Sequence, residues 1–481
     1  MNLEQWCQLD ERIYSAEMDE RYKQHAGLKC SEHVIEQLAE MRSVSAKIFL
    51  GSFSQPRELF LSSLENIADS STKKQELKLY NLRNQKIVSS NQRFSGSPVN
   101  WSTWRQFNSV QKDPGKRKRV FDDFISKTRH ISPVIKERFD QIGKIYAEYS
   151  HRQLGPLDGY LENEKISYSQ LISIVKSMGR QAKKPFSEAL ATISKRVLGR
   201  EAEYYDDFYF FRNRVYADLE KDFSRLNPPE QVRRTLAAMQ FNLSAIHFDT
   251  ENRKNKYPSP ICFFVQVPED IRVLYKSESS YFDFQGCYHE MGHAVHASSI
   301  SPNAEYWNRY SFSMGIAEIF SIFLERLTKN KKYLLSLGIR DSRVLEEIEA
   351  RNKFMELFFV TFYTANSLMK AEFWRKKLTM EKASDLYARL IKEYTGLEMP
   401  GQYWMLHHIL PDAIMYVPSY LLAAVRAAEL DRHLQDRFGE EWWAQTGSGG
   451  YIREIMEPGA GIDLSRFSKL DSSLFMNEIT S

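Results

Sequence analysis

Two histidines four residues apart give the clearest chemical signal in this sequence. His289 and His293 belong to the motif H-E-x-x-H, and Glu290 follows the first of them. Residues four apart lie on one face of an α-helix, so both imidazoles can bind the same zinc ion. Glu290 can then accept a proton from a water molecule that the metal has acidified. The motif therefore predicts a helix that carries a catalytic zinc site, with one Zn²⁺ per chain.

A catalytic zinc site uses three protein ligands and leaves one position open, so the motif requires a third residue. Glu318 is the candidate, because the apolar residues around it recur at helical spacing and would bury it within a helix. A carboxylate is rarely buried without a partner, and a zinc ion is a natural one. The alternatives are a helix with two surface histidines and a partly exposed glutamate without a metal. The apolar residues at this spacing are Ile316, Ile319, Phe320, Phe323, Leu324 and Leu327.

The composition argues against several classes of partner. A chain of 481 residues, of which 42% are hydrophobic, is long enough to bury a large core. Its net charge of +4 is too balanced to indicate binding to nucleic acid or to an anionic membrane. No run approaches the ~18–20 apolar residues of a membrane-spanning helix. We therefore expect neither nucleic acid nor a membrane as a partner.

The first residues and the cysteines indicate a cellular compartment. The N-terminus lacks the basic region followed by an apolar region that is typical of a signal peptide. Four cysteines, Cys7, Cys30, Cys262 and Cys287, are scattered without C-x-x-C spacing. This pattern favours free thiols in a reducing environment, so we expect a cytoplasmic protein.

Helical patterns dominate the sequence and predict a mainly α fold. The clearest β region is residues 258–275, where two apolar, β-prone runs flank a turn at Pro268 and predict a hairpin shortly before the histidine motif. An edge strand beside a zinc site can pair with an extended peptide, although a hairpin that only packs against helices is an equal alternative. Residues 89–100 are expected to interrupt the helical pattern and residues 151–163 to be a connection, while the basic run 112–119 is expected to be a solvated turn that leads into a helix over residues 120–128.

Late in the chain, His408, Tyr416 and Tyr420 have side chains that can donate a hydrogen bond. Peptide hydrolysis builds negative charge on the oxygen of a tetrahedral intermediate, and each donor aimed at that charge lowers the barrier by a few kcal/mol. Pro418 suits the first position of a helix over residues 418–435, which places Tyr420 in its first turn. The alternative is that the tyrosines are packing residues and that local hydrogen bonds satisfy the histidine.

Five stretches together resemble the thimet oligopeptidase and oligoendopeptidase F family of zinc metallopeptidases. Residues 289–296, HEMGHAVH, match the family's H-E-x-G-H-x-x-H, and residues 318–325, EIFSIFLE, are similar to its E-x-x-S-x-x-x-E helix with the third ligand. These two are specific in combination. The supporting stretches are residues 247–254, 378–396 and 113–119, so the resemblance runs from about Asp113 to the C-terminus.

This resemblance implies an elongated, mainly helical fold with two lobes, a deep central channel and a small β-hairpin beside the zinc helix. It implies a zinc-dependent oligopeptidase that cleaves internal bonds of short peptides, because a narrow channel excludes folded proteins. A domain boundary expected near residues 164–167, where a serine precedes a new helix, separates an N-terminal helical region, 1–165, from a catalytic region, 166–481. The chain is short for the family, so the N-terminal lobe is expected to be reduced.

The resemblance also implies residue roles. The implied Zn²⁺ ligands are His289, His293 and Glu318, the implied base is Glu290, and a histidine and tyrosines near the C-terminus are the implied transition-state donors. In place of the family's tyrosine-rich segment this chain has residues 408–420, in which Tyr420, twelve after His408, fits the donor position better than Tyr416 does.

Two other functions stay open at this point. The angiotensin-converting enzyme type shares H-E-x-x-H and a glutamate at a similar distance, but it has an aspartate where this chain has Ile322. A carboxydipeptidase of that type is one alternative, and it would need a basic residue to bind the terminal carboxylate of its substrate. A non-catalytic peptide-binding protein that keeps the fold is the other alternative.

Overall fold

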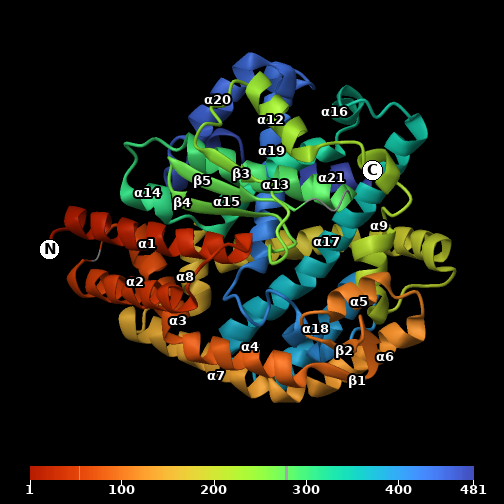
Figure 1. The fold of residues 1–481 in the computed structure, drawn as a ribbon, viewed down its shortest axis with the longest axis horizontal. Helices are drawn as coiled ribbons and strands as arrows, with labels where there is room; N and C mark the ends of the chain where they lie inside the picture. The colour runs from red at the N-terminus through yellow and green to blue at the C-terminus, as the bar shows by residue number, and fades with distance from the viewer. Residues whose placement is uncertain (54, 277–279) are drawn as a thin grey trace. The chain divides into compact units, whose positions relative to one another are not determined.

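The structure, a computed structural model, describes residues 1–53, 55–276 and 280–481 (Figure 1). The described residues are mainly helical, which confirms the predicted fold class, and they include two small β-sheets. Within these residues no helix is both long enough and apolar enough to cross a membrane.

The chain divides into two compact units, and each is assembled from separate segments. The first unit consists of Met1–Ser70, Leu219–Glu349 and Leu422–Phe475. The second consists of Ser71–Asp218, Ala350–Leu421 and Met476–Ser481. The expected division after residue 165, placed where a serine precedes a new helix, stays a prediction.

A three-stranded sheet in the first unit contains the predicted hairpin. Strands β4 (Ile261–Gln266) and β5 (Asp270–Leu274) pair antiparallel, with Cys262 opposite Val273. Strand β3 (Ile246–Asp249), which the sequence analysis did not predict, pairs parallel to β5. The strand order is β3-β5-β4, so β4 is an edge strand of this sheet.

Helices cover both faces of this sheet. Alternate side chains of a strand point to opposite faces. Phe263 on β4 faces α1 (Leu3–Ala26), where its ring lies 5.7 Å from that of Tyr22. The next residue, Phe264, lies on the other face, with its ring 6.5 Å from that of His293 on α13 (Tyr281–Ser299). The sheet therefore separates the N-terminal helix from the helix that carries the histidine motif.

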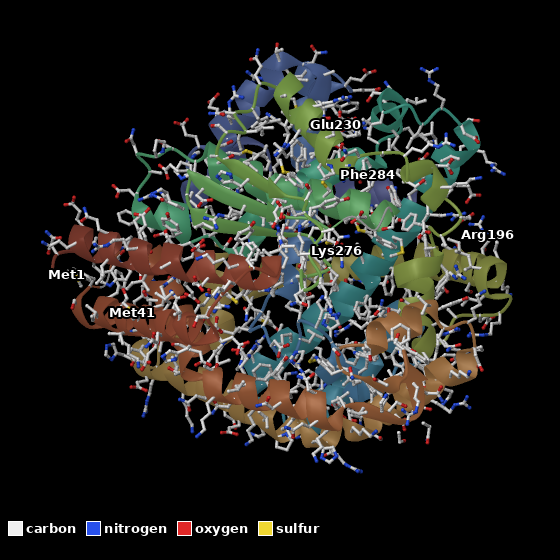
Figure 2. All side chains as sticks on the ribbon, in the orientation of Figure 1. Met1, Met41, Arg196, Glu230, Lys276 and Phe284 are labelled. Atoms are coloured by element: carbon white, nitrogen blue, oxygen red, sulfur yellow. The ribbon has the colours of Figure 1, made fainter. Side chains whose placement is uncertain are left out.

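Aromatic packing fixes the N-terminal half of α13 in the core. The helix begins after Ser280, whose hydroxyl accepts a hydrogen bond from the backbone N–H of Asp283 at 3.1 Å. Phe284, labelled in Figure 2, is buried, and its ring lies 4.9 Å from that of Tyr288 and 5.6 Å from that of Phe223. These contacts fix the position of the part of α13 that precedes its two histidines.

The second unit departs from the sequence-based expectations in three places. Residues 89–100, where the helical pattern was expected to break, form a hairpin of β1 (Val88–Phe94) and β2 (Ser97–Asn100) that was not predicted. The helix expected over residues 120–128 begins earlier, because α6 (Pro114–Lys127) takes in most of the basic run with Asp113 as its N-cap. Residues 151–163 are a connection only in part, because α8 (Pro156–Asn163) begins at Pro156.

Longer helices form most of the second unit. Ser167 caps α9 (Tyr168–Leu198), as the predicted boundary requires, and Thr379 caps α18 (Met380–Thr395). Two long helices, α17 (Ser342–Lys376) and α19 (Val417–Phe438), contribute residues to both units, and the ends of α3 (Arg57–Ser71) and α21 (Ser473–Thr480) also cross a boundary between units. The other α-helices are α2 (Glu32–Ser52), α4 (Lys73–Lys86), α5 (Trp104–Val110), α7 (Ser132–Tyr149), α10 (Asp207–Tyr209), α11 (Glu220–Phe223), α12 (Pro228–Ala238), α14 (Tyr306–Tyr310), α15 (Met314–Glu325), α16 (Lys331–Ser336) and α20 (Thr446–Met456).

Candidate metal centre

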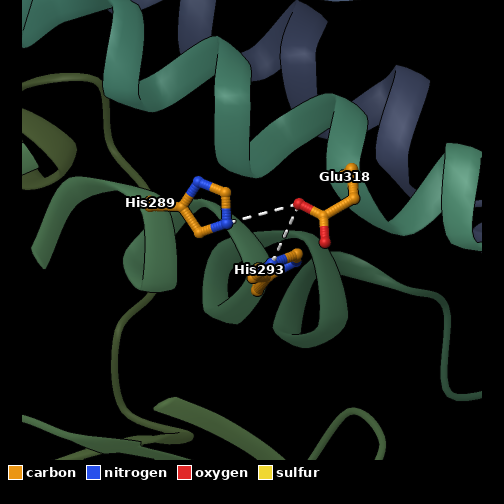
Figure 3. Close-up of side chains that lie close together, drawn as sticks. All are labelled: His289, His293 and Glu318. Atoms are coloured by element: carbon orange, nitrogen blue, oxygen red, sulfur yellow. Dashed lines mark ion pairs between the residues drawn. The ribbon is translucent and has the colours of Figure 1, made fainter. Parts of the chain in front are cut away.

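Three side chains from two neighbouring helices of the first unit converge on one point. Oε2 of Glu318, on α15, lies 3.3 Å from Nε2 of His289 and 3.6 Å from Nε2 of His293, both on α13 (Figure 3). One donor atom from each residue lies within 4.8 Å of the other two. The structure thus brings together the three residues that the sequence predicts as metal ligands.

The spacing of these donor atoms suits a tetrahedral metal ion. Two ligand atoms that each lie about 2.0–2.1 Å from a tetrahedral zinc ion are separated by roughly 3.3 Å from each other. The two distances from Glu318, 3.3 and 3.6 Å, are close to this value and are longer than typical hydrogen bonds. Two imidazole nitrogens and one carboxylate oxygen are also a ligand set that zinc accepts, with a fourth position left open.

A glycine allows the two helices to approach closely enough. A Cβ atom on Gly292, which precedes His293, would lie 2.3 Å from the carbonyl oxygen of Phe320 and 2.5 Å from Cα of Ser321. Both of these atoms belong to the backbone of α15, so no side-chain rotation can relieve the contact. The absence of a side chain at residue 292 therefore sets the distance between the histidines and Glu318.

A second carboxylate orients the first histidine. Nδ1 of His289 donates a hydrogen bond to Oε2 of Glu325 at 3.0 Å, and Nζ of Lys329 lies 2.8 Å from the other oxygen of Glu325. A hydrogen bond at Nδ1 fixes the tautomer and leaves Nε2 available to a metal. Ser321 likewise orients Glu318, because its hydroxyl donates to Oε2 at 3.0 Å.

Sequence reasoning did not assign a role to Glu325 or Ser321. Both residues appear in the stretch that resembles the E-x-x-S-x-x-x-E helix, but only as part of its pattern. Their spacing could have identified them. Ser321 and Glu325 follow Glu318 by three and seven residues, so all three lie on one face of α15. Neighbours that orient metal ligands often occupy such positions.

The electrostatics of the cluster favour one positive charge at this point. Burial alone would lower the pKa of His289, but the neighbouring carboxylates of Glu318 and Glu325 outweigh it and raise this pKa well above its ordinary value. Burial lowers the pKa of His293 to about 4, so this second imidazole is neutral. Burial opposes ionisation of Glu325, yet Lys329 and His289 lower its pKa to about 2. The carboxylates of Glu318 and Glu325 therefore favour a positive charge beside them, which a metal ion would also supply.

Glu290, the predicted base, lies between this cluster and the sheet. Burial raises the pKa of its carboxyl to about 7, although the neighbouring His289 favours the charged form. The carboxylate also accepts a hydrogen bond from the backbone N–H of Cys262 on the edge strand β4. The base and an edge strand are thus neighbours, while pairing of that strand with a peptide stays a prediction.

The three predicted hydrogen-bond donors belong to the second unit. Tyr420 lies in the first turn of α19, as the position of Pro418 predicts. Its ring stacks on that of Tyr363 at 5.6 Å and lies 5.0 Å from that of Tyr416. The ring of His408 lies 4.4 Å from that of His407, tilted by 31°. These ring contacts show that the three side chains take part in packing. The catalytic roles of His408, Tyr416 and Tyr420 stay predictions.

Comparisons with known proteins do not identify a family. No family model matches the chain, and no curated protein shows significant similarity to it.

Proposed function

We propose that the protein is a zinc-dependent oligopeptidase that hydrolyses internal bonds of short peptides. The observation that carries this proposal is the convergence of His289, His293 and Glu318 within 4.8 Å, with Glu290 next to the first histidine. A nitrogen–oxygen ligand set beside a partly buried carboxylate is the arrangement that metal-assisted hydrolysis requires. The resemblance to the thimet oligopeptidase and oligoendopeptidase F family supports the choice of a peptide as the substrate.

The proposed roles follow from where each side chain lies. His289, His293 and Glu318 would hold the zinc ion, whose chemistry when bound is to acidify water and polarise the peptide carbonyl. Glu290 accepts a proton from the attacking water and returns it to the leaving amine. Glu325 keeps His289 in the orientation that presents Nε2, through the 3.0 Å hydrogen bond to Nδ1.

The negative charge that develops on the carbonyl oxygen needs hydrogen-bond donors. We assign this role to His408, Tyr416 and Tyr420, with Tyr420 as the first choice because it lies at the start of a helix twelve residues after His408. A two-lobed arrangement with a channel that admits only short peptides is also part of the proposal.

The proposed location is the cytoplasm. All four cysteines are free thiols, and Cys7 and Cys287 are buried. Free cysteines without disulfides are typical of proteins in a reducing compartment.

The decisive experiment compares Glu290→Gln with the unchanged protein on two peptides of identical sequence, one blocked at both ends and one with free ends. The amide cannot accept a proton, so we expect zinc to be retained and turnover to fall by several orders of magnitude. Glu305→Gln, an exposed glutamate of the same unit, is the matched control and should leave turnover unchanged.

The products separate the competing functions. An oligopeptidase cleaves the blocked peptide at an internal bond. A carboxydipeptidase leaves the blocked peptide intact and releases a dipeptide from the free C-terminus. A non-catalytic binding protein cleaves neither, and cleavage that is equally fast in Glu290→Gln would disprove the role of Glu290.

A further inference from the structure

A cavity of about 990 Å³ lies entirely within the second unit. Its walls come from α7, the segment between α7 and α8, α8 itself, the first residue of α9, and the end of α17 with the turn that leads to α18. We propose that this cavity binds a small amphipathic anion, that is, an organic molecule with an apolar body and a carboxylate, sulfonate or phosphate group. This inference does not depend on the proposed peptidase activity, because none of the cavity's residues belongs to the unit that contains the metal centre.

The floor of the cavity is apolar. The rings of Phe139 and Trp374 lie 5.2 Å apart, and the ring of Phe373 lies 5.3 Å from that of Phe139. The indole N–H of Trp374 donates to the carbonyl oxygen of Ile414 at 2.9 Å, so Trp374 offers the cavity only apolar surface. Trp374 is partly exposed although it is large and apolar, which indicates surface that a ligand can cover. The aliphatic residues of the lining are Leu154, Leu157, Leu161 and Leu378.

The charged residues of the lining are mainly basic. Five basic and two acidic side chains contribute to it, an excess of three positive charges. Lys136 is paired with Asp140, Arg375 lies over the ring of Tyr168 at 4.1 Å, and Asp158 accepts a hydrogen bond from the backbone of α8's N-cap. Both acidic residues of the lining, Asp140 and Asp158, are therefore engaged in contacts within the protein.

Three further basic residues line the cavity. Lys144, Arg152 and Lys377 are exposed, and within residues 1–53, 55–276 and 280–481 none of them has an ion pair. Like charges around one cavity repel each other, and an anion bound among them removes that repulsion. The exposed basic side chains therefore form a cationic rim, and the apolar side chains form the floor of the cavity.

The size of the cavity restricts the ligand. Pockets of about 300–1,000 Å³ that are mostly apolar and carry a few polar groups bind small molecules rather than macromolecules. The apolar floor favours a ring system or an acyl chain, and the cationic rim favours an acidic head group. An amphipathic organic anion satisfies both requirements at once.

The test uses the full-length protein and two probes, 8-anilinonaphthalene-1-sulfonate with an aromatic body and decanoate with an aliphatic one. We expect saturable binding of at least one probe to a single site by calorimetry, with an affinity that falls as salt is added. The double variant Arg152→Glu and Lys377→Glu should weaken binding by roughly tenfold or more, because each change reverses a charge at the rim. Both residues are exposed, so the melting temperature should be unchanged.

The matched control is the double variant Lys183→Glu and Lys184→Glu on α9. Both lysines are exposed, neither lines the cavity, and the change in net charge is the same. Binding of the aromatic probe alone, or of the aliphatic probe alone, would identify the type of body that the floor accepts. The proposal is overturned if neither probe binds, if the rim variant binds as tightly as the unchanged protein, or if the control variant loses affinity to the same extent.

Discussion

Replacing Gly292 by alanine is the smallest change that should disturb the metal centre without altering a donor atom. The added Cβ would lie 2.3 Å from the carbonyl oxygen of Phe320 and 2.5 Å from Cα of Ser321. Non-bonded atoms of this kind are separated by at least about 3.5 Å, so α15 must move away from α13 by roughly 1 Å. Glu318 lies on α15 and the two histidines lie on α13, so the movement directly separates the ligands.

This displacement should change both the unfolding free energy and the zinc affinity. Adding a methyl group to a well-packed contact costs about 1–3 kcal/mol of unfolding free energy. Metal–ligand distances tolerate changes of only about 0.2 Å, so a movement of roughly 1 Å weakens or removes the bond to Glu318. We expect zinc affinity to fall by at least about 10–100-fold, the range observed when groups that orient metal ligands are lost.

The assay is competition with a zinc chelator of known affinity, with urea unfolding measured alongside. Gly143→Ala on α7 is the control for helix propensity, because a Cβ there meets nothing within 4 Å. This control should be neutral or stabilised by about 0.5–1 kcal/mol. Gly286→Ala is a control on α13 itself, where the nearest atom is a side-chain carbon of Pro260 at 3.2 Å. If Gly292→Ala binds zinc and unfolds like Gly143→Ala, the close approach does not position the ligands.

Three further predictions concern single side chains. His293→Ala should remove the bound zinc, and full zinc content in that variant would show that the ligands are wrongly assigned. Glu325→Gln should weaken zinc binding by about 10–100-fold while the fold keeps its melting temperature within a few degrees, and unchanged affinity would exclude an orienting role. Tyr420→Phe should lower kcat and kcat/KM together by roughly 10–1000-fold if its hydroxyl stabilises the oxyanion. Unchanged kinetics in Tyr420→Phe would leave Tyr420 as a packing residue against Tyr363, where its ring stacks at 5.6 Å.

The sequence predicted those features of the fold that depend on local spacing. His289 and His293 share a face because they are four residues apart on one helix, and Glu318 is buried because its apolar neighbours recur at helical spacing. The hairpin of the first unit was predicted because each of its strands is β-prone and its turn is short. Strand β3 was missed, because its parallel pairing with β5 joins segments that are separated in the chain.

Two corrections show where local patterns mislead. Residues 151–163 contain Gly155 and Gly159, which suggested a connection, yet a Cβ on Gly159 would lie 2.7 Å from the ring of Tyr146. That glycine is required for packing within a helix and not for a turn. In the basic run, Arg117 is buried and paired with Asp206, a residue 89 positions away, which no local pattern indicates.

Whether this chain is a zinc-dependent peptidase can be measured by titrating the metal-free protein with zinc while the cleavage of a short blocked peptide is followed. We expect no turnover without metal, a linear rise in turnover with added zinc and a break at one zinc ion per chain. Cleavage by the metal-free protein at the full rate, or no cleavage when one zinc ion is bound, would contradict this expectation.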